Sequence, residues 1–191
     1  MRSLKICALC VLLILALAVP MATAQRVKVD AEQRYLLLAT KRTGTMEKEL
    51  NEVADQGFRV LVGSPTSGAE MAVFMERVAT PPKTYKYKLL ATTRTGTMNR
   101  ELNEAAADGW RLLPRTMISK QGVGPFAGIE IIVLLERAPD TEMKYEYKLL
   151  ATTLTRTLQK EVTESMAAGY TLAGMVSRDE HMVIMERESR R

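Results

Sequence analysis

The sequence predicts an α+β fold made of three tandem β-α-β-β repeats. A segment of about 50 residues recurs three times along the chain, which is the first observation behind this prediction. The start of each copy alternates polar and apolar residues, and the middle of each copy carries an apolar stripe at helical spacing. The composition agrees, because 47% hydrophobic and 26% charged residues are typical of a folded globular protein.

The central copy is the clearest of the three and reads YKYKLLATTRTGTMNRELNEAAADGWRLL over residues 85–113. Residues 35–61 and 145–172 repeat this pattern, and each copy ends with an apolar run closed by Glu-Arg. These limits predict repeats over 34–78, 85–138 and 144–188, linkers at 79–84 and 139–143, an N-terminal lead-in at 25–33 and a C-terminal tail at 189–191.

Each copy opens with a strand that leads into a helix. In the central copy Tyr85, Tyr87 and Leu89 alternate with lysines, which is the period of a strand with one face in water. After a threonine-rich turn, Met98 and Leu102 begin an apolar helical stripe that the other copies share. The hydroxyl predicted to cap each helix start belongs to Thr45, Thr97 or Thr157. The left-handed residue predicted to follow each helix is Gly57, Gly109 or Gly169.

The second half of each copy predicts a β-hairpin. Its last strand, at residues 71–75, 129–135 and 181–185, is nearly continuous in apolar residues, which predicts a central strand buried on both faces. Since strand-helix-strand crossovers are right-handed, we expect the sheet order 2-3-1 in each repeat, with the first strand antiparallel to the third. We expect the repeats to pack in a pseudo-threefold arrangement; the alternative is three independent domains on short linkers.

Residues 1–24 have the order of a secretory signal peptide. Arg2 and Lys5 precede an apolar run from Ile6 to Val19, and small residues follow up to Ala24. The apolar run is too short to cross a hydrocarbon core of about 30 Å as a helix. We expect cleavage after Ala24 and export to a periplasm or the extracellular space, with an uncleaved N-terminal anchor as the alternative.

The shared pattern combines Tyr-x-Tyr-Lys, Glu-Leu-Asn, Gly-Trp and a final Glu-Arg. In the central copy these residues are Tyr85, Tyr87, Lys88, Glu101, Leu102, Asn103, Gly109, Trp110, Glu136 and Arg137. The pattern resembles a family of short βαββ domains known as domain of unknown function 4177, and the resemblance covers nearly the whole chain after the leader. The third copy departs from it at Arg156, Val162 and Thr163. The resemblance implies the βαββ fold, and since the family carries no assigned activity, it implies no catalytic residue.

The composition narrows the classes of function. Two Cys and one His exclude a cysteine-rich zinc module and a histidine-cluster metal site. His181 falls at a strand position with too few ligands nearby, and the carboxylates of Glu101 and Glu104 have the spacing of any solvated helix face. Without the leader, 25 basic and 22 acidic residues remain, and they are too interspersed for a nucleic-acid footprint. We therefore expect no catalytic residue, metal or cofactor.

Three further groups of residues have an expected place. Glu136 and its equivalents are expected to end the last strand at the surface, with ion pairs between copies. Trp110 is expected to anchor the core behind the helix cap. Most methionines of the repeats are expected to fill core positions, namely Met46, Met71, Met75, Met98, Met166, Met182 and Met185.

The helix starts are the candidate ligand-binding sites. Free backbone N–H groups and a nearby arginine at an Arg-Thr-Gly-Thr turn are able to hold a phosphate, sulfate or carboxylate. The candidate residues are Arg42, Thr45, Arg94, Thr97, Arg156 and Thr157. The simpler interpretation is that threonine caps the helix and glycine makes the turn.

These observations lead to the expectation of an exported, non-catalytic repeat protein that acts as a binding or assembly module. Its partner would be a protein, or a second copy joined through sheet edges. The first alternative is a binder of anions or acidic glycans through the helix starts. The second is an extracytoplasmic hydrolase, which requires a carboxylate cleft that the sequence does not locate. We expect no nucleic acid partner and no membrane contact after removal of the signal peptide.

Overall fold

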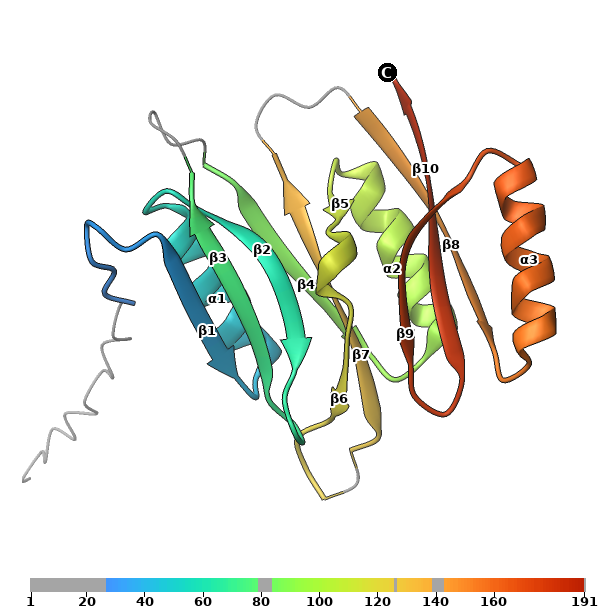
Figure 1. Cartoon of the computed structure of the whole chain (residues 1–191), viewed down its shortest axis with the longest axis horizontal. Coiled ribbons are helices and arrows are strands. Elements are labelled where there is room, and N and C mark those ends of the chain that lie inside the picture. Colours follow the sequence, from blue (N-terminus) through green and yellow to red (C-terminus); the bar gives the residue numbers. More distant parts are fainter. Residues whose placement is uncertain (1–26, 79–83, 126, 139–142, 191) are drawn as a thin grey trace, which may run out of the picture.

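A computed structural model describes residues 27–78, 84–125, 127–138 and 143–190, so the predicted signal peptide and nearly all of both linkers lie outside the described residues. The described chain folds into three α-helices and ten strands, and the strands form three antiparallel sheets (Figure 1). The α+β fold class is confirmed. The elements follow one another in three strand–helix–hairpin groups, which we call units 1, 2 and 3.

The three units have the following elements. Unit 1 contains β1 (Tyr35–Thr40), α1 (Thr43–Ala54), β2 (Phe58–Pro65) and β3 (Met71–Arg77). Unit 2 contains β4 (Lys86–Thr92), α2 (Thr95–Ala107), β5 (Arg111–Leu112), the 3-10 helix η1 (Pro114–Thr116), β6 (Ile118–Gln121) and β7 (Ile129–Arg137). Unit 3 contains β8 (Met143–Thr152), α3 (Thr155–Ala167), β9 (Thr171–Ser177) and β10 (His181–Arg190).

The last strand is central in every sheet. The observed orders are β1-β3-β2, β4-β7-β5 with β6 also on β7, and β8-β10-β9, and every pairing is antiparallel. The predicted order 2-3-1 is therefore confirmed in each sheet. The prediction that the central strand is buried on both faces holds for most of β7 and for residues 182–185 of β10 but is wrong for β3, where Phe74 is exposed.

The helix starts differ from the prediction, whereas the helix ends confirm it. The N-cap residues are Arg42, Arg94 and Leu154, with no side-chain cap hydrogen bond at any of these described starts. Thr45, Thr97 and Thr157 lie inside the first helical turn and are not N-caps. The side-chain hydroxyls of the strand-end threonines Thr40, Thr92 and Thr152 accept the backbone N–H of the N-cap residue, so the threonine that stabilises each turn lies before the helix and not in its first turn. The left-handed glycines after the helices are Gly57, Gly109 and Gly169, with φ of 89°, 86° and 86°.

A short segment of unit 2 wedges between the second strands of units 1 and 3. The strand after the helix is irregular at the same place in each unit: Leu61 and Ala173 are β-bulges, and Leu113 leads into η1. A Cβ added at Gly63 of β2 would lie 3.3 Å from Thr116 Cα, and one at Gly174 of β9 would lie 3.3 Å from the carbonyl oxygen of Pro114. Glycine therefore permits the close approach on both sides of η1.

Each of the first two helices is covered by the sheet of the next unit. The core around α1 contains Met46 and Leu50 together with Ile132 and Leu134 of β7. The alternate residues of β7 point to the other face of the sheet, where they form the core around α2. That second core also takes in residues of β10, so sheets and helices alternate along the molecule (Figure 1).

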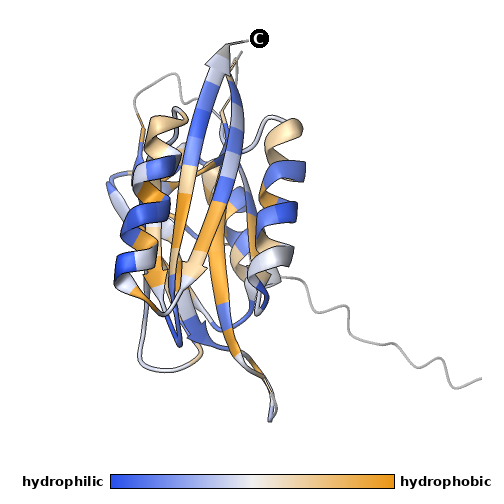
Figure 2. Cartoon of the chain, turned by 90° about the vertical axis from the view of Figure 1, so that its right-hand side faces the viewer, coloured by the Kyte–Doolittle hydropathy of each residue, from blue (hydrophilic) through white to orange (hydrophobic). Residues whose placement is uncertain are grey.

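The units form an open row and not the expected pseudo-threefold body. The strand β1 lies at one end of the long axis and α3 lies at the other (Figure 1). A threefold arrangement would place α3 against β1, whereas here each unit presents its helix face to the back of the next sheet, and the row does not close. Figure 2, seen from the α3 side, shows hydrophobic residues concentrated along the strands and hydrophilic residues on the helices. In the described residues no helix is both long and apolar enough to cross a membrane.

Candidate functional site

The two junctions between units are built from the same side chains. Each junction joins a tyrosine and a glutamate of one sheet to an arginine and an asparagine of the unit before it. The arginine follows the helix at the start of the second strand, and the asparagine lies in the helix. The best-defined polar site of the described chain is therefore an assembly site that occurs twice.

At the first junction the carboxylate of Glu136 is held by two side chains. Arg59 donates to it twice, from Nε at 2.9 Å and from Nη2 at 2.7 Å. The hydroxyl of Tyr87 also donates to Glu136, at 3.0 Å, and accepts the backbone N–H of Val60 at 3.0 Å. Because Glu136 is buried, the prediction that it ends the strand at the surface is wrong, whereas the expected ion pair between units is confirmed.

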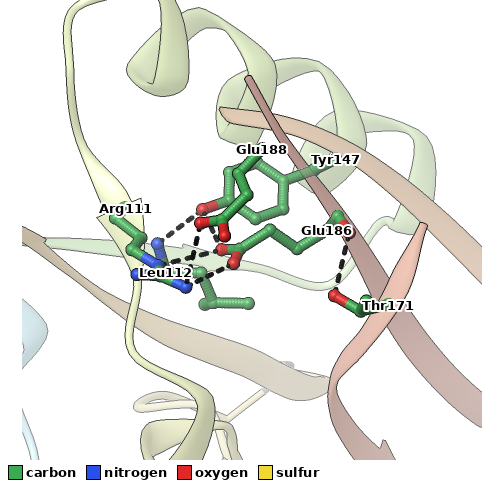
Figure 3. Close-up of polar contacts among 6 residues, drawn as sticks. All are labelled: Arg111, Leu112, Tyr147, Thr171, Glu186 and Glu188. Carbon is green, nitrogen blue, oxygen red and sulfur yellow. Dashed lines mark hydrogen bonds and ion pairs between the residues drawn. The ribbon is translucent and has the colours of Figure 1, made fainter. Parts of the chain in front are cut away.

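The second junction reproduces this arrangement (Figure 3). Arg111 donates to Glu186 from Nη2 at 2.7 Å and from Nε at 3.4 Å. Tyr147 donates to the same carboxylate at 2.9 Å and accepts the N–H of Leu112 at 2.8 Å. Glu188 adds a second carboxylate 3.7 Å from Arg111. No buried side-chain oxygen or nitrogen of the described residues lacks a hydrogen-bond partner, so the cluster holds the two sheets at one fixed register.

Burial and charge set the protonation states at both junctions. The pKa of Tyr87 and that of Tyr147 are raised far above the usual value, first by burial and then by the neighbouring glutamate. The hydrogen bond to Glu136 raises the pKa of Arg59. Burial lowers the pKa of Arg111, but the hydrogen bond and charge of Glu186 outweigh it, so the net shift is upward. Both tyrosines are therefore neutral hydrogen-bond donors, and both arginines are charged.

An asparagine of α1 and one of α2 each bind the edge strand of the next sheet. Asn51 Nδ2 donates to the carbonyl of Tyr87 and the N–H of Tyr87 donates to Asn51 Oδ1, each at 2.9 Å. Asn103 makes the same two bonds with Tyr147, again at 2.9 Å. One helical turn earlier, Glu47 accepts the N–H of Leu89 at 2.8 Å.

At the second junction Asn99 accepts the N–H of Leu149 at 3.0 Å, in the place that Glu47 has at the first. Residues four apart on a helix lie on one face and match alternate residues of a strand edge. The helix thus provides the partners that a neighbouring strand would otherwise provide to β4 and β8, and neither of these edges remains open over the residues involved.

The β1 end of the row presents the same kind of surface with no unit over it among the described residues. Tyr35 is 46% exposed, whereas its equivalent Tyr87 is 2% exposed. Leu37 and Phe74 are exposed as well, and Leu134, the equivalent of Phe74, is fully buried. We call the group Tyr35, Leu37, Val62, Phe74 and Glu76 the β1 end face. It corresponds to the sheet face that is buried at both internal junctions.

The α3 end presents the opposite half of a junction, but two polar residues differ. Met166 and Leu172 are exposed at positions where units 1 and 2 have buried residues. The position of Asn51 and Asn103 is taken by Thr163, and that of Arg59 and Arg111 by Thr171. We call the group Thr163, Met166, Thr171 and Leu172 the α3 end face.

The predicted ligand-binding residues lie near the surface at three separate helix starts. Arg42 and Arg94 are exposed N-cap residues, and Arg156 and Thr157 are exposed in the first turn of α3. The start of α1, including Thr45, borders a hollow of about 480 Å³. Thr97 of α2 lies partly buried in the first turn of its helix.

The start of α2 is approached from unit 3. The guanidinium of Arg178 donates to the carbonyl of Thr93 at 2.9 Å and to that of Ile129 at 3.0 Å. The three helix starts therefore have different surroundings, although their sequences are similar.

Other sequence candidates have ordinary places in the fold. His181 lies at the hairpin tip of unit 3 with Nδ1 3.0 Å from the hydroxyl of Ser177. Glu104 pairs with Arg100 on the helix surface. No group of three or more metal-ligating side chains is present in the described chain. The methionine prediction is confirmed for Met46, Met71, Met75, Met98, Met182 and Met185 and is wrong for Met166.

A pocket of about 340 Å³ lies beside the first junction, between Arg59 and Arg111. Each guanidinium stacks on a tyrosine, Arg59 at 4.5 Å from the ring centre of Tyr85 and Arg111 at 4.8 Å from that of Tyr145. Since both arginines already pair with glutamates, their charges are balanced, and the pocket has the character of a crevice between packed units.

The sequence contained a signal for the junction that periodicity does not detect. Arg59 and Arg111 occupy one register position, the second residue after the helix-ending glycine, and the third copy has Thr171 there. Asn51, Asn103 and Thr163 show the same change from copy to copy. Residues that units 1 and 2 share, whose helices are covered by the next sheet, and that unit 3 lacks indicate a contact between units.

Comparisons of this chain with protein families, with curated proteins and with solved structures give no match. The resemblance to domain of unknown function 4177 therefore stays a prediction.

Proposed function

We propose that this chain is an exported, non-catalytic tandem-repeat protein that serves as a binding or assembly module, with the β1 end face as its binding surface. One observation carries the proposal: side chains that are buried wherever one unit follows another are exposed at β1. Tyr35 and Phe74 lie bare where Tyr87 and Leu134 are covered. A surface shaped to be covered by a folded unit is suited to bind one.

The apolar part of the β1 end face supplies a driving force for binding. Complete burial of a fully exposed side chain of this size contributes about 1.5–3 kcal/mol, and because Leu37 and Phe74 are 50% and 43% exposed, each contributes about half of that. Contiguous apolar patches with a polar rim mark interaction sites on soluble proteins. Here Glu76 and Arg34 provide the rim, joined by an ion pair of 3.0 Å.

The polar groups that recur between units support assembly over catalysis. At both junctions the tyrosine, glutamate and arginine side chains make hydrogen bonds to one another and to backbone groups. A carboxylate that works as an acid or base needs access to a substrate, and Glu136 and Glu186 are buried against their arginines. The recurring chemistry therefore fixes geometry.

A photo-crosslinking amino acid at position 37 of the full chain, expressed in its native compartment, tests the proposal. We expect a discrete crosslinked product from position 37 and none from position 160, an exposed control site on α3. Phe74→Asp should abolish the product and leave the circular dichroism spectrum unchanged. Equal crosslinking at both sites would contradict the binding role. Turnover of a defined substrate that is lost when one acidic residue is replaced would contradict the non-catalytic role.

A second candidate function is the binding of an anion or acidic glycan at the helix starts. The hollow at the start of α1 supports it, because Lys41, Arg42 and Thr45 line that hollow. The candidate predicts binding to a sulfated glycan that weakens with salt and falls when Arg42 or Arg94 is changed to Ala. Unchanged affinity of both variants, measured by isothermal titration calorimetry, would end it.

A further inference from the structure

We propose that unit 3 terminates the row, and that the β1 end face accepts the helix face of a strand–helix–hairpin unit on a different chain, one with asparagine and arginine at the positions of Asn51 and Arg59. The inference rests on the proposed function and names the chemistry of the partner. It is argued from the two internal junctions, which show what such a face binds.

The backbone of β1 has its partner positions in place. The N–H of Arg77 donates to the carbonyl of Arg34. The backbone N–H and C=O groups of the even-numbered residues of β1 therefore point toward β3, and those of the odd-numbered residues point away from the sheet. The outward residues Tyr35 and Leu37 correspond to Tyr87 and Leu89 of β4, which bind Asn51 and Glu47 of the preceding helix. A helix with asparagine at the matching position would bind β1 in the same way.

The side chains of β1 and β3 complete the match. Glu76 pairs in register with Tyr35, as Glu136 does with Tyr87. The side chain of Glu76 is 33% exposed, whereas those of Glu136 and Glu186 are 6% and 7% exposed beneath their arginines. The carboxylate is therefore positioned to receive an arginine from outside the chain.

Two residues just before β1 occupy these positions in the structure. Arg34 pairs with Glu76 at 3.0 Å and lies over the ring of Tyr35, with 5.0 Å between guanidinium carbon and ring centre. The amide of Gln33 donates to the carbonyl of Tyr35 at 3.0 Å, the group that an incoming asparagine would bind. Both side chains lie in exposed surroundings, so a partner is able to displace them.

The α3 end face of a second copy lacks the matching groups. The hydroxyl of Thr163 donates at 2.9 Å to the carbonyl of Gln159 in its own helix. Thr171 donates at 3.2 Å to the carbonyl of Glu186 in its own sheet. A second copy would bring apolar contacts from Met166 and Leu172 but would bury the edge of β1 without its partners, which is unfavourable.

Restoring the missing groups in the full chain tests this inference. Thr163 and Thr171 are both exposed, so T163N/T171R should fold as the wild type does. We expect the wild type to sediment as a monomer and T163N/T171R to form head-to-tail oligomers, with self-association at least about tenfold tighter. Adding Phe74→Asp should return the variant to a monomer, and adding Arg34→Ala should tighten association further because it removes the competing guanidinium.

A matched control separates association through hydrogen bonds from non-specific apolar association. T163L/T171M has side chains of similar length without the hydrogen bonds and should remain a monomer; association equal to that of T163N/T171R would overturn the proposal. A folded T163N/T171R that stays monomeric would overturn it too, as would wild-type oligomers that Phe74→Asp dissolves. The crosslink at position 37 is an independent readout. If position 37 crosslinks but T163N/T171R does not associate, the partner chemistry is refuted and the proposed function stands. If position 37 gives no crosslink, the proposed function is refuted.

Discussion

Asn51 and Tyr87 exchange two hydrogen bonds of 2.9 Å between a helix side chain and a strand edge. Asn103 and Tyr147 repeat this exchange at the next junction. An amide is suited to the position because it donates and accepts at once, as a backbone peptide does. The helix thereby takes the place of a strand, and three small sheets are joined without sharing one.

Replacing the asparagine should weaken the junction. Asn103→Ala leaves the carbonyl and N–H of Tyr147 without these partners in a partly buried place, so we expect a loss of about 1–3 kcal/mol in the free energy of unfolding. Thr163→Ala, at the same position of α3, should cost less than about 0.5 kcal/mol because Thr163 is exposed. Urea unfolding of both variants measures the difference, and equal losses would contradict the role of Asn103.

Replacing a junction glutamate should reduce the free energy of unfolding more, the more deeply that glutamate is buried. Glu186→Gln breaks the paired contact with Arg111, whose side chain is 46% exposed, so solvent screening limits the cost to about 1–2 kcal/mol. Glu76→Gln at the open end should cost less than about 0.5 kcal/mol. Thermal denaturation followed by circular dichroism compares the two, and a larger effect at Glu76 would argue against the burial account.

Stability should fall at alkaline pH because of the buried tyrosines. In the folded chain the pKa of Tyr87 and that of Tyr147 are raised above the ordinary 10.0. Above that pH the unfolded chain loses two phenolic protons that the folded chain keeps, so stability present below pH 10 is lost as the pH rises. The double variant Y87F/Y147F should be less stable at neutral pH and show a flatter decline between about pH 9 and 11. Urea midpoints across that range provide the measurement, and identical slopes would contradict the assignment.

Two glycine substitutions should have opposite signs. In Gly174→Ala the new methyl group meets the Met117 side chain and the carbonyl of Pro114, so we expect a loss of about 1–3 kcal/mol. In Gly44→Ala the methyl group has no neighbour within 4 Å and lies in α1, so the change should stabilise the chain by about 0.5–1 kcal/mol. Melting temperatures of the two variants report the signs directly, and a stabilising Gly174→Ala would disprove the wedge of η1 between the sheets.

Local periodicity predicted the first strand, the helix and the last strand of each unit, but not η1, which divides the second strand of unit 2 into β5 and β6. The stripe of Met98 and Leu102 predicted α2, and alternation at Tyr85 and Tyr87 predicted the strand that includes Tyr87, because each signal depends only on which face of one element is buried. The N-cap prediction was wrong because each turn has threonines on both sides. Thr40 and Thr92, at the strand ends, accept the N–H of the N-cap residue, whereas Thr45 and Thr97 lie inside the first helical turn.

Contacts between units were beyond the reach of periodicity. Arg59 and Glu136 are 77 residues apart in sequence, and neither belongs to an apolar stripe. The exposed Phe74 was misread for the same reason: its sequence matches the buried strands of the other copies, and only its place at the end of the row leaves it uncovered. The open row depends on the packing of the helix face of one unit against the back of the next sheet. The three copies have similar faces, so their sequences do not show whether the row closes on itself.

The alternation of sheets and helices gives the chain a direction in which it opens. The first two helices each lie beneath a second sheet, whereas α3 rests on one small cluster of buried residues, namely Leu150, Leu158, Val183 and Met185. Opening of the native state begins where the fewest apolar contacts must be given up. Amide protons of α3 should therefore exchange with deuterium sooner than those of α1 and α2, and fraying should proceed from the C-terminal unit inward.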